Sequence, residues 1–94
     1  MIRVLIERLV LPGTEEKLLA ALLAMRRDAV HAPGYISGET LHDMVDPRHY
    51  VIISTWRSRA AWDTWAGCDA RQRTRTQIAP MLAAPEKISL LEPI

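Results

Sequence analysis

The chain has 94 residues, of which 49% are hydrophobic, and its formal net charge at neutral pH is +1. This length predicts one domain over residues 1–94, and charges of mixed sign exclude the basic surface of a nucleic-acid binder. The single cysteine, Cys68, excludes an internal disulfide framework and a cysteine-based zinc site. No apolar run approaches the ~20 residues that span a bilayer, and no signal-peptide pattern opens the chain. We therefore expect a cytoplasmic protein with no membrane partner.

The first third of the chain predicts a strand and then a helix. Residues 2–11 are apolar on both sides, which is typical of a buried strand. Pro12 and Gly13 interrupt this strand, and Thr14 suits the N-cap of a helix that stops before Ala32-Pro33-Gly34. A broad apolar stripe predicts that the helix packs on a core, and it comprises Leu18, Leu19, Leu22, Leu23, Met25 and Ala29.

The middle of the chain predicts a hairpin followed by a short helix. Residues 35–44 and 49–56 are expected to form antiparallel strands joined by a turn at Asp46-Pro47. Ser58 suits the N-cap of the helix, which carries Trp62 and Trp65 on one side. With Trp56, all three tryptophans lie within ten positions, and such rings either fill a core or form the walls of a pocket for a flat ligand.

The C-terminal third predicts one more helix and a final strand. Gly67 suits the end of the tryptophan-bearing helix, and Asp69 suits the N-cap of the next helix. Pro80 makes the last turn of that helix irregular. Residues 86–91 then form a strand that is again apolar on both sides.

The order β-α-β-β-α-(α)-β predicts an α+β, ferredoxin-like split βαβ fold, in which helices cover one face of an antiparallel sheet. Because the strands are apolar on both faces, the uncovered face would expose a large apolar patch in a monomer. Packing two sheets face to face would bury that patch. We therefore expect a symmetric homodimer through the face that carries Ile2, Val4, Ile6 and Val10.

Three segments carry a family resemblance. They are W-x-S-x-x-A-W-x-x-W from Trp56 to Trp65, APGYISGETLHD from Ala32 to Asp43, and the start IERLVLPGTEEK. With them, essentially the whole chain resembles the antibiotic biosynthesis monooxygenase (ABM) family of dimeric α+β barrels. That family includes polyketide-oxidising monooxygenases, haem-degrading enzymes and an autoinducer-handling protein. In the polyketide and quinol branches, the resemblance implies oxygen chemistry without metal, flavin or haem, on an electron-rich aromatic substrate.

The haem-degrading branch matches this chain at one of three key positions. Trp65 aligns with the pocket tryptophan of that branch, but Glu7 stands where the branch has an asparagine. Arg75 stands where the branch has its haem-ligating histidine. Arginine has no free lone pair and stays charged, so it does not ligate iron in the ordinary way. The resemblance therefore disfavours haem degradation, and we expect no cofactor.

A candidate site follows from polar residues that interrupt apolar faces. Glu7 shares a strand face with Leu5 and Leu9, and a buried carboxylate there would need a partner such as Arg75 or a raised pKa. Glu7 could then act as general base on a phenolic hydroxyl, while Arg75 stabilises negative charge on oxygen. Trp65 would stack on the substrate ring. The predicted catalytic residues are Glu7, Trp65 and Arg75, and the predicted substrate pocket comprises Leu5, Leu9, Trp62 and His42.

Simpler roles stay open for these residues. Glu7 and Arg75 could form a structural ion pair or reach solvent, and Trp62 could be core packing. At the level of function, the chain could be a cofactor-independent monooxygenase for a small aromatic or polyketide-like substrate. It could also be a non-catalytic binder of a small hydrophobic molecule, or a purely structural or regulatory dimer.

Overall fold

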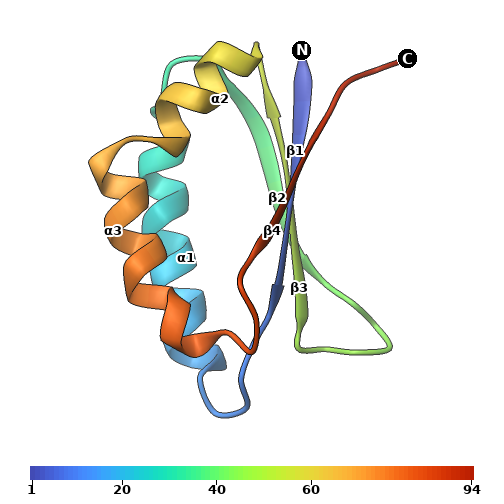
Figure 1. The fold of residues 1–94 in the computed structure, drawn as a ribbon, viewed down its shortest axis with the longest axis vertical. Coiled ribbons are helices and arrows are strands. Elements are labelled where there is room, and N and C mark those ends of the chain that lie inside the picture. The colour runs from blue at the N-terminus through green and yellow to red at the C-terminus, as the bar shows by residue number, and fades with distance from the viewer.

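A computed structural model describes all residues of the chain, 1–94. Four strands, three α-helices and a 3₁₀ turn follow one another in the predicted order (Figure 1). Strand bounds match the prediction closely, although the first and second strands each end two residues before the predicted end. The elements are β1 (Ile2–Leu9), α1 (Glu15–Ala29), β2 (Tyr35–His42), β3 (His49–Trp56), α2 (Arg59–Ala66), α3 (Asp69–Ile78), η1 (Ala79–Met81) and β4 (Lys87–Leu91).

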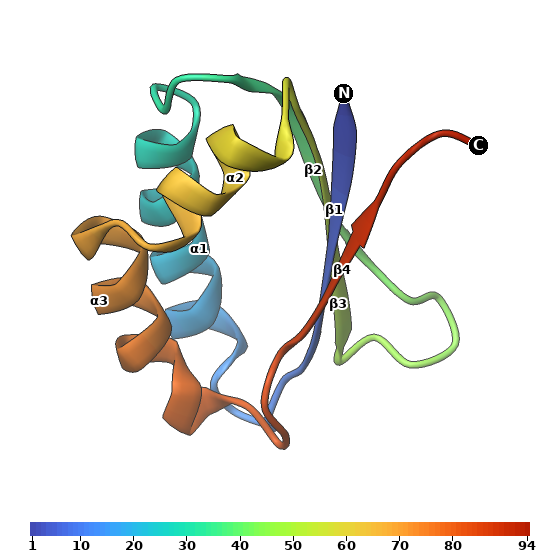
Figure 2. The same ribbon diagram turned by 45° about the horizontal axis from the view of Figure 1, so that its top comes forward.

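The four strands form one antiparallel sheet in the order β2-β3-β1-β4. All three helices lie on the same side of it, so the sheet keeps one open face (Figures 1 and 2). This arrangement confirms the predicted α+β, ferredoxin-like architecture. No helix is long and apolar enough to cross a membrane.

The helices cover the sheet face that we predicted to be open. Val4 and Ile6 of β1 are buried beneath the helices, and Val10 just after the strand is buried as well. The predicted dimer face, Ile2 with these three residues, is therefore wrong. Because side chains alternate along a strand, both sets of β1 residues looked apolar, and only the positions of the helices distinguish them.

The open sheet face carries the other set of side chains. Leu5 of β1 pairs with Ile53 of β3, and Leu9 at the end of β1 is 43% exposed. Leu41 on β2 and Leu91 on β4 are also exposed. An apolar sheet face thus exists as predicted, but on the opposite side from the residues that we assigned to it.

Two of the three predicted N-cap residues stand at the N-cap position, and one does not. The Ser58 hydroxyl oxygen accepts the backbone N–H of Ala61 at 3.1 Å, which confirms the predicted N-cap of α2. Thr14 is the N-cap residue of α1 as predicted, but its hydroxyl donates to the carbonyl of Leu11 at 2.7 Å and makes no side-chain cap hydrogen bond. Cys68 is the N-cap of α3, and the predicted cap Asp69 is the first residue of that helix.

The core lies between the helices and the covered face of the sheet. Trp56, at the end of β3, is 1% exposed and contacts both tryptophans of α2. Leu18 of α1 and Ile78 of α3 are equally buried and belong to the same apolar cluster. Two arginines, Arg8 and Arg71, are buried on this side of the sheet, which makes the core unusual.

Candidate functional site

A cavity of about 70 Å³ opens between the helices and the covered face of the sheet. Residues from α1, α2, α3 and the three strands β1, β2 and β3 line it, and most of the lining is apolar or aromatic. Its apolar and aromatic wall comprises Ile6, Leu22, Met25, Ala29, Tyr35, Ile52, Trp56, Trp62 and Trp65. Such a lining with a few polar groups is typical of a small-molecule site.

The three tryptophans form one aromatic cluster in this wall. The rings of Trp56 and Trp65 are stacked at 6.3 Å between centroids, and those of Trp56 and Trp62 meet edge to face at 5.6 Å. Tyr35 also meets Trp56 edge to face, at 5.4 Å. The Trp56 indole N–H donates to the Ser54 hydroxyl oxygen at 3.0 Å, which satisfies this buried donor. The cluster holds its rings in fixed orientations around the cavity.

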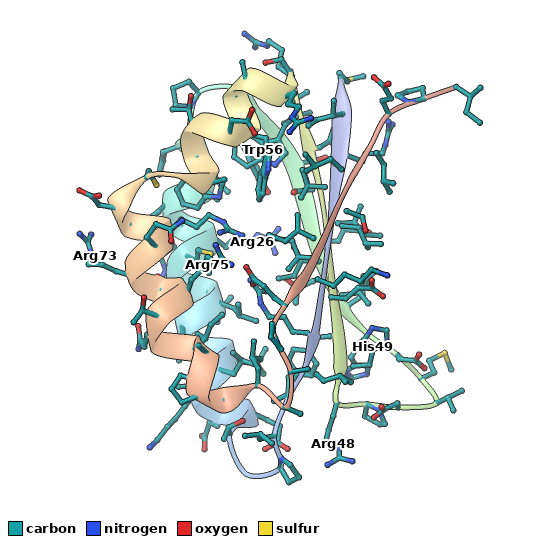
Figure 3. The ribbon with its side chains drawn as sticks, in the orientation of Figure 1. Arg26, Arg48, His49, Trp56, Arg73 and Arg75 are labelled. Atoms are coloured by element: carbon teal, nitrogen blue, oxygen red, sulfur yellow. The ribbon has the colours of Figure 1, made fainter.

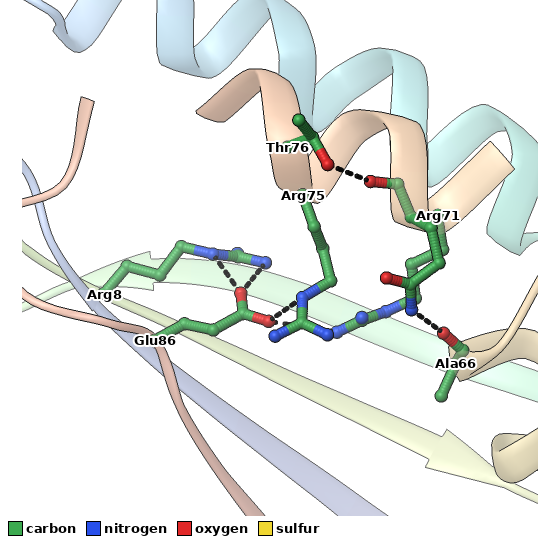
Figure 4. Close-up of polar contacts among 7 residues, drawn as sticks. Arg8, Ala66, Arg71, Arg75, Thr76 and Glu86 are labelled. Carbon is green, nitrogen blue, oxygen red and sulfur yellow. Dashed lines mark hydrogen bonds and ion pairs between the residues drawn. The ribbon is translucent and has the colours of Figure 1, made fainter. Parts of the chain in front are cut away.

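Three arginines converge on one carboxylate beside the cavity (Figure 4). Arg8 donates from Nε to Glu86 Oε2 at 3.0 Å, and Arg75 Nε lies 2.7 Å from Oε1. Arg71 Nη2 donates to the same Oε1 at 3.5 Å. Burial lowers the pKa of Arg8 and of Arg71, and the negative charge of Glu86 opposes both shifts. Both guanidinium groups stay charged at any working pH because arginine does not deprotonate in proteins.

Several N–H groups of the two buried arginines have no hydrogen-bond partner. These are Nη1 and Nη2 of Arg8 and Nε and Nη1 of Arg71. Arg8 Nη2 lies 2.9 Å from Glu86 Oε2, but without the alignment of a hydrogen bond. Arg71 also stacks on Trp62, with its guanidinium carbon 5.1 Å from the ring centroid. Buried donors are normally paired, so these N–H groups are available to an acceptor on a ligand in the cavity.

The mouth of the cavity lies between α1 and the edge strand β2. Arg26 of α1 extends toward the sheet (Figure 3) and donates from Nη2 to the carbonyl of Gly38 at 3.2 Å. Gly38 leaves room for the Tyr35 hydroxyl, because a Cβ there would lie 2.6 Å from that oxygen. Glu39 and Thr40 complete the polar rim. The exposed Arg26 contact is the one that a ligand entering on this side would have to displace.

The structure separates the predicted general base from the cavity. Glu7 lies on the open face of the sheet, where its carboxylate is 3.4 Å from His49 Nε2 and 4.0 Å from Lys87 Nζ. Arg75 binds Glu86 on the helix side, so the predicted contact between Glu7 and Arg75 does not form. The expectation that Glu7 faces the helices was wrong, because strand alternation places Arg8, its neighbour, on that side.

The other predicted site residues divide in the same way. Trp65 and Trp62 line the cavity, and Trp65 is 8% exposed. Leu5 and Leu9 lie with Glu7 on the open face. His42 packs near Tyr50, with ring centroids 6.4 Å apart, and is not part of the cavity lining. The geometry therefore keeps the two tryptophans and removes Glu7, Leu5, Leu9 and His42 from the pocket.

The residues that sequence reasoning missed are Arg8, Arg71 and Glu86. Arg8 is in phase with Val4 and Ile6 along β1, so the alternation already placed it on a buried face. Arg71 lies seven residues before Ile78, which puts both on one face of α3. Either spacing could have distinguished these arginines from solvated ones.

No group of three His, Cys, Asp or Glu side chains in the structure could hold a metal ion.

Comparisons with known proteins agree with the fold. The family model described as antibiotic biosynthesis monooxygenase matches residues 1–77. A solved antibiotic biosynthesis monooxygenase is similar at a TM-score of 0.91 with 20% identity, over 100% of this chain and 99% of the other. A conserved protein of Methanosarcina mazei has a TM-score of 0.94 with 14% identity, over 99% and 92% of the two chains. A protein of Mycobacterium tuberculosis has a TM-score of 0.90 with 25% identity, over 99% and 94%.

A search of the curated proteins gives no match. The matched segment includes β1, which carries Arg8, the two tryptophans of α2 and nearly all of α3. It therefore covers more than half of the chain and most of the cavity wall. This chain belongs to the antibiotic biosynthesis monooxygenase family.

Proposed function

We propose that the chain is a cofactor-independent monooxygenase that oxidises a small aromatic or polyketide-like substrate in the tryptophan-walled cavity. The observation that carries the proposal is this cavity, in which Trp56, Trp62 and Trp65 surround a space beside two buried arginines. Membership of the antibiotic biosynthesis monooxygenase family supports the reaction class. Flat aromatic rings suit such a wall because they stack on indole faces and edges.

The reaction needs only the substrate and dioxygen. An activated ring methylene, as in anthrone, loses two hydrogens and gains one oxygen atom from O₂, and the second oxygen atom leaves as water. The conversion of CH₂ and O₂ into C=O and H₂O balances all atoms and the four electrons that pass to dioxygen. The electron-rich anion of the substrate is the electron donor. The contribution of the protein is to bind this anion, orient it and exclude bulk water.

The size and shape of the cavity set the binding mode. Its volume of about 70 Å³ is smaller than the ~150 Å³ cavity that holds benzene in a well-packed protein. A ligand with fused rings must therefore extend through the mouth and displace Arg26 from the carbonyl of Gly38. In the bound state, Trp65 would stack on the substrate ring and Tyr35 would lie at its edge.

The test is oxygen consumption with anthrone or a quinol as substrate. Trp65 and Tyr50 are both 8% exposed, but only Trp65 lines the cavity, so Trp65→Leu and Tyr50→Leu form a matched pair. We expect both changes to lower the melting temperature and only Trp65→Leu to abolish turnover. Trp65→Phe refines the test, since it retains most of the apolar volume. Equal turnover in both leucine variants, or no oxygen uptake by the wild-type protein, would contradict the proposal.

One observation favours a binding protein without catalysis as the second candidate. No histidine lines the cavity, and the one carboxylate at its border, Glu39, is exposed and pairs with Ile53 of the open face, so a buried general base is absent. In this alternative the same aromatic ligand is bound but not oxidised. Calorimetric binding of anthraquinone, together with no oxygen uptake from anthrone, would identify it.

We further propose that two copies pair through the open face of the sheet. Leu5, Ile53, Leu41 and Leu91 form an apolar patch there, and a sheet with one bare apolar face is rarely stable alone. Charges of both signs lie beside the patch, with Glu7 and Lys87 in contact. A two-fold axis through this face would bury the apolar patch of one copy against the same patch of the other, which favours a second copy of the chain as the partner.

Light scattering tests the homodimer. Ile53→Lys removes an apolar side chain from the centre of the open face, and Leu19→Lys makes a similar change on the exposed side of α1. We expect the wild-type protein and the Leu19 variant to have twice the monomer mass, and the Ile53 variant to have the monomer mass. A wild-type monomer at micromolar concentration would refute the homodimer.

A further inference from the structure

We propose that the ligand of the cavity carries an anionic oxygen, a carboxylate or a phenolate, that binds between Arg8 and Arg71. The aromatic part of this ligand rests on the proposed function, whereas the anionic part rests on the arginines alone. The inference therefore specifies the substrate class: an aromatic molecule that is bound as an oxyanion.

Two buried arginines carry N–H donors that have no partner. Arg8 is 2% exposed and Arg71 is 1% exposed, and both line the cavity. Arg8 Nη1 and Arg71 Nε and Nη1 have no acceptor, and Arg8 Nη2 has only the poorly aligned contact with Glu86. A buried donor without an acceptor destabilises the folded protein, and the cost is larger when the group is charged. An oxyanion in the cavity would accept these N–H groups in charge-assisted hydrogen bonds.

The cluster of three arginines around Glu86 carries more positive than negative charge. Three guanidinium groups share the single carboxylate of Glu86, whose side chain is 6% exposed. Arg75 is 40% exposed, so water screens its charge, but water does not reach the side chains of Arg8 and Arg71 in this way. One carboxylate cannot neutralise two buried cations as well as the third. An anionic ligand would supply the charge that the cluster lacks.

The buried arginines lie beside the aromatic wall of the cavity. The Arg71 guanidinium lies 5.1 Å from the centroid of Trp62, and Trp62 contacts the Trp56 ring. Glu86 lies outside the cavity lining and binds both inner arginines from behind, and Arg75, also outside the lining, contacts the same carboxylate. A ligand ring against the tryptophans would thus bring a substituent to the guanidinium groups. Such a site would bind an aromatic molecule with an anionic substituent more tightly than an aromatic hydrocarbon.

Isothermal titration calorimetry with matched naphthalene and anthracene derivatives tests the inference. One pair is the 2-carboxylate and its neutral 2-carboxamide, which have nearly the same shape. The other is the 2-hydroxy compound and its 2-methoxy ether, and the absorption spectrum of the bound hydroxy compound shows whether it is ionised. We expect about tenfold or tighter binding of the carboxylate over the amide, or of the ionised hydroxy compound over the ether. The pair that shows the preference identifies carboxylate or phenolate.

Two variants of α3 provide the matched control. Arg71→Met removes the buried guanidinium but keeps the apolar stem, and Arg73→Met makes the same change on the exposed side of the helix (Figure 3). The preference for the anion should fall about tenfold in the first variant and stay unchanged in the second. If Arg71→Met does not fold, the ligand pairs on the wild-type protein decide the matter alone.

The outcomes separate this inference from the proposed function. Equal binding of anionic and neutral partners would overturn the anionic site while the aromatic pocket survives. An anion preference without oxygen uptake would support the site and refute the monooxygenase. Failure of every aromatic compound to bind would overturn both. An anion preference that survives in Arg71→Met would also overturn the assignment to these arginines.

Discussion

The two faces of the sheet differ in how deeply their charged side chains are buried and how closely these are paired. On the covered face, Arg8 is almost fully buried and is held by Glu86 from the segment before β4. On the open face, the next residue in the chain, Glu7, is half-exposed and has only loose contacts, 3.4 Å from His49 and 4.0 Å from Lys87. Neighbours in sequence thus carry opposite charges into opposite environments.

The polar groups of the two faces differ in their effect on stability. A loose surface ion pair contributes little to stability, so the contacts of Glu7 need no role beyond solubility. A buried cluster with too few acceptors is costly, and a protein gains from it only when a partner completes it. This contrast supports the proposals that place the ligand on the covered face and the second copy on the open face.

The largest expected contrast compares adjacent residues of β3. Trp56→Ala removes a ring that is 1% exposed on the covered face, and we expect it to lower the free energy of unfolding by about 3–5 kcal/mol. Thr55→Ala, one residue earlier and on the open face, should cost about 1 kcal/mol or less. Urea unfolding measures both values. Equal costs would break the distinction between the two faces.

The two glutamates provide the next contrast. Glu86→Gln leaves buried arginines without their carboxylate, and we expect a loss of about 3–5 kcal/mol in the free energy of unfolding. Glu7→Gln changes a half-exposed side chain on the open face and should cost about 0–1 kcal/mol. Thermal and urea unfolding at constant ionic strength measure this difference. A larger loss in the Glu7 variant would mean that the open face holds the more important charge.

The smallest expected effect concerns Asp43 in the turn between β2 and β3. The backbone N–H of Val45, then that of Asp46, and then His49 lower the pKa of Asp43 below its usual value. A lowered folded-state pKa adds stability above the unfolded value of about 4, and this stability is lost as the pH falls through the folded pKa. Asp43→Asn should remove that part of the acid dependence. Urea titrations between about pH 2 and pH 6 would show parallel curves if the turn does not matter.

Local signals predicted most of the fold. β3 covers the predicted range 49–56, and Ser58 caps α2 as its position implied, whereas β2 ends at His42, two residues before the predicted end. The side of the sheet that the helices cover could not be read from β1, because Val4 and Leu5 are equally suited to a core. Only the tertiary position of α1 and α3 decides that question, and with it the fate of Glu7.

Of the residues that line the cavity, the sequence predicted two aromatic ones. Trp62 and Trp65 were expected at the pocket because the two residues share a helix face and Trp65 matches a family position. Arg8 and Glu86 come from opposite ends of the chain, 78 residues apart, and no local pattern links them. Arg71 had a usable signal in its phase with Ile78, but the neighbouring arginines of α3 suggested a solvated run.

The placement of the indoles has a spectroscopic consequence. Trp56, Trp62 and Trp65 are all the tryptophans of the chain, and all three line the cavity. The tryptophan emission of the folded protein therefore originates entirely from the walls of one site. Entry of a ring or of a quenching quinone would change the colour or the intensity of that light. The protein thus carries its own reporter of occupancy, and a library of compounds could be screened against it without a label.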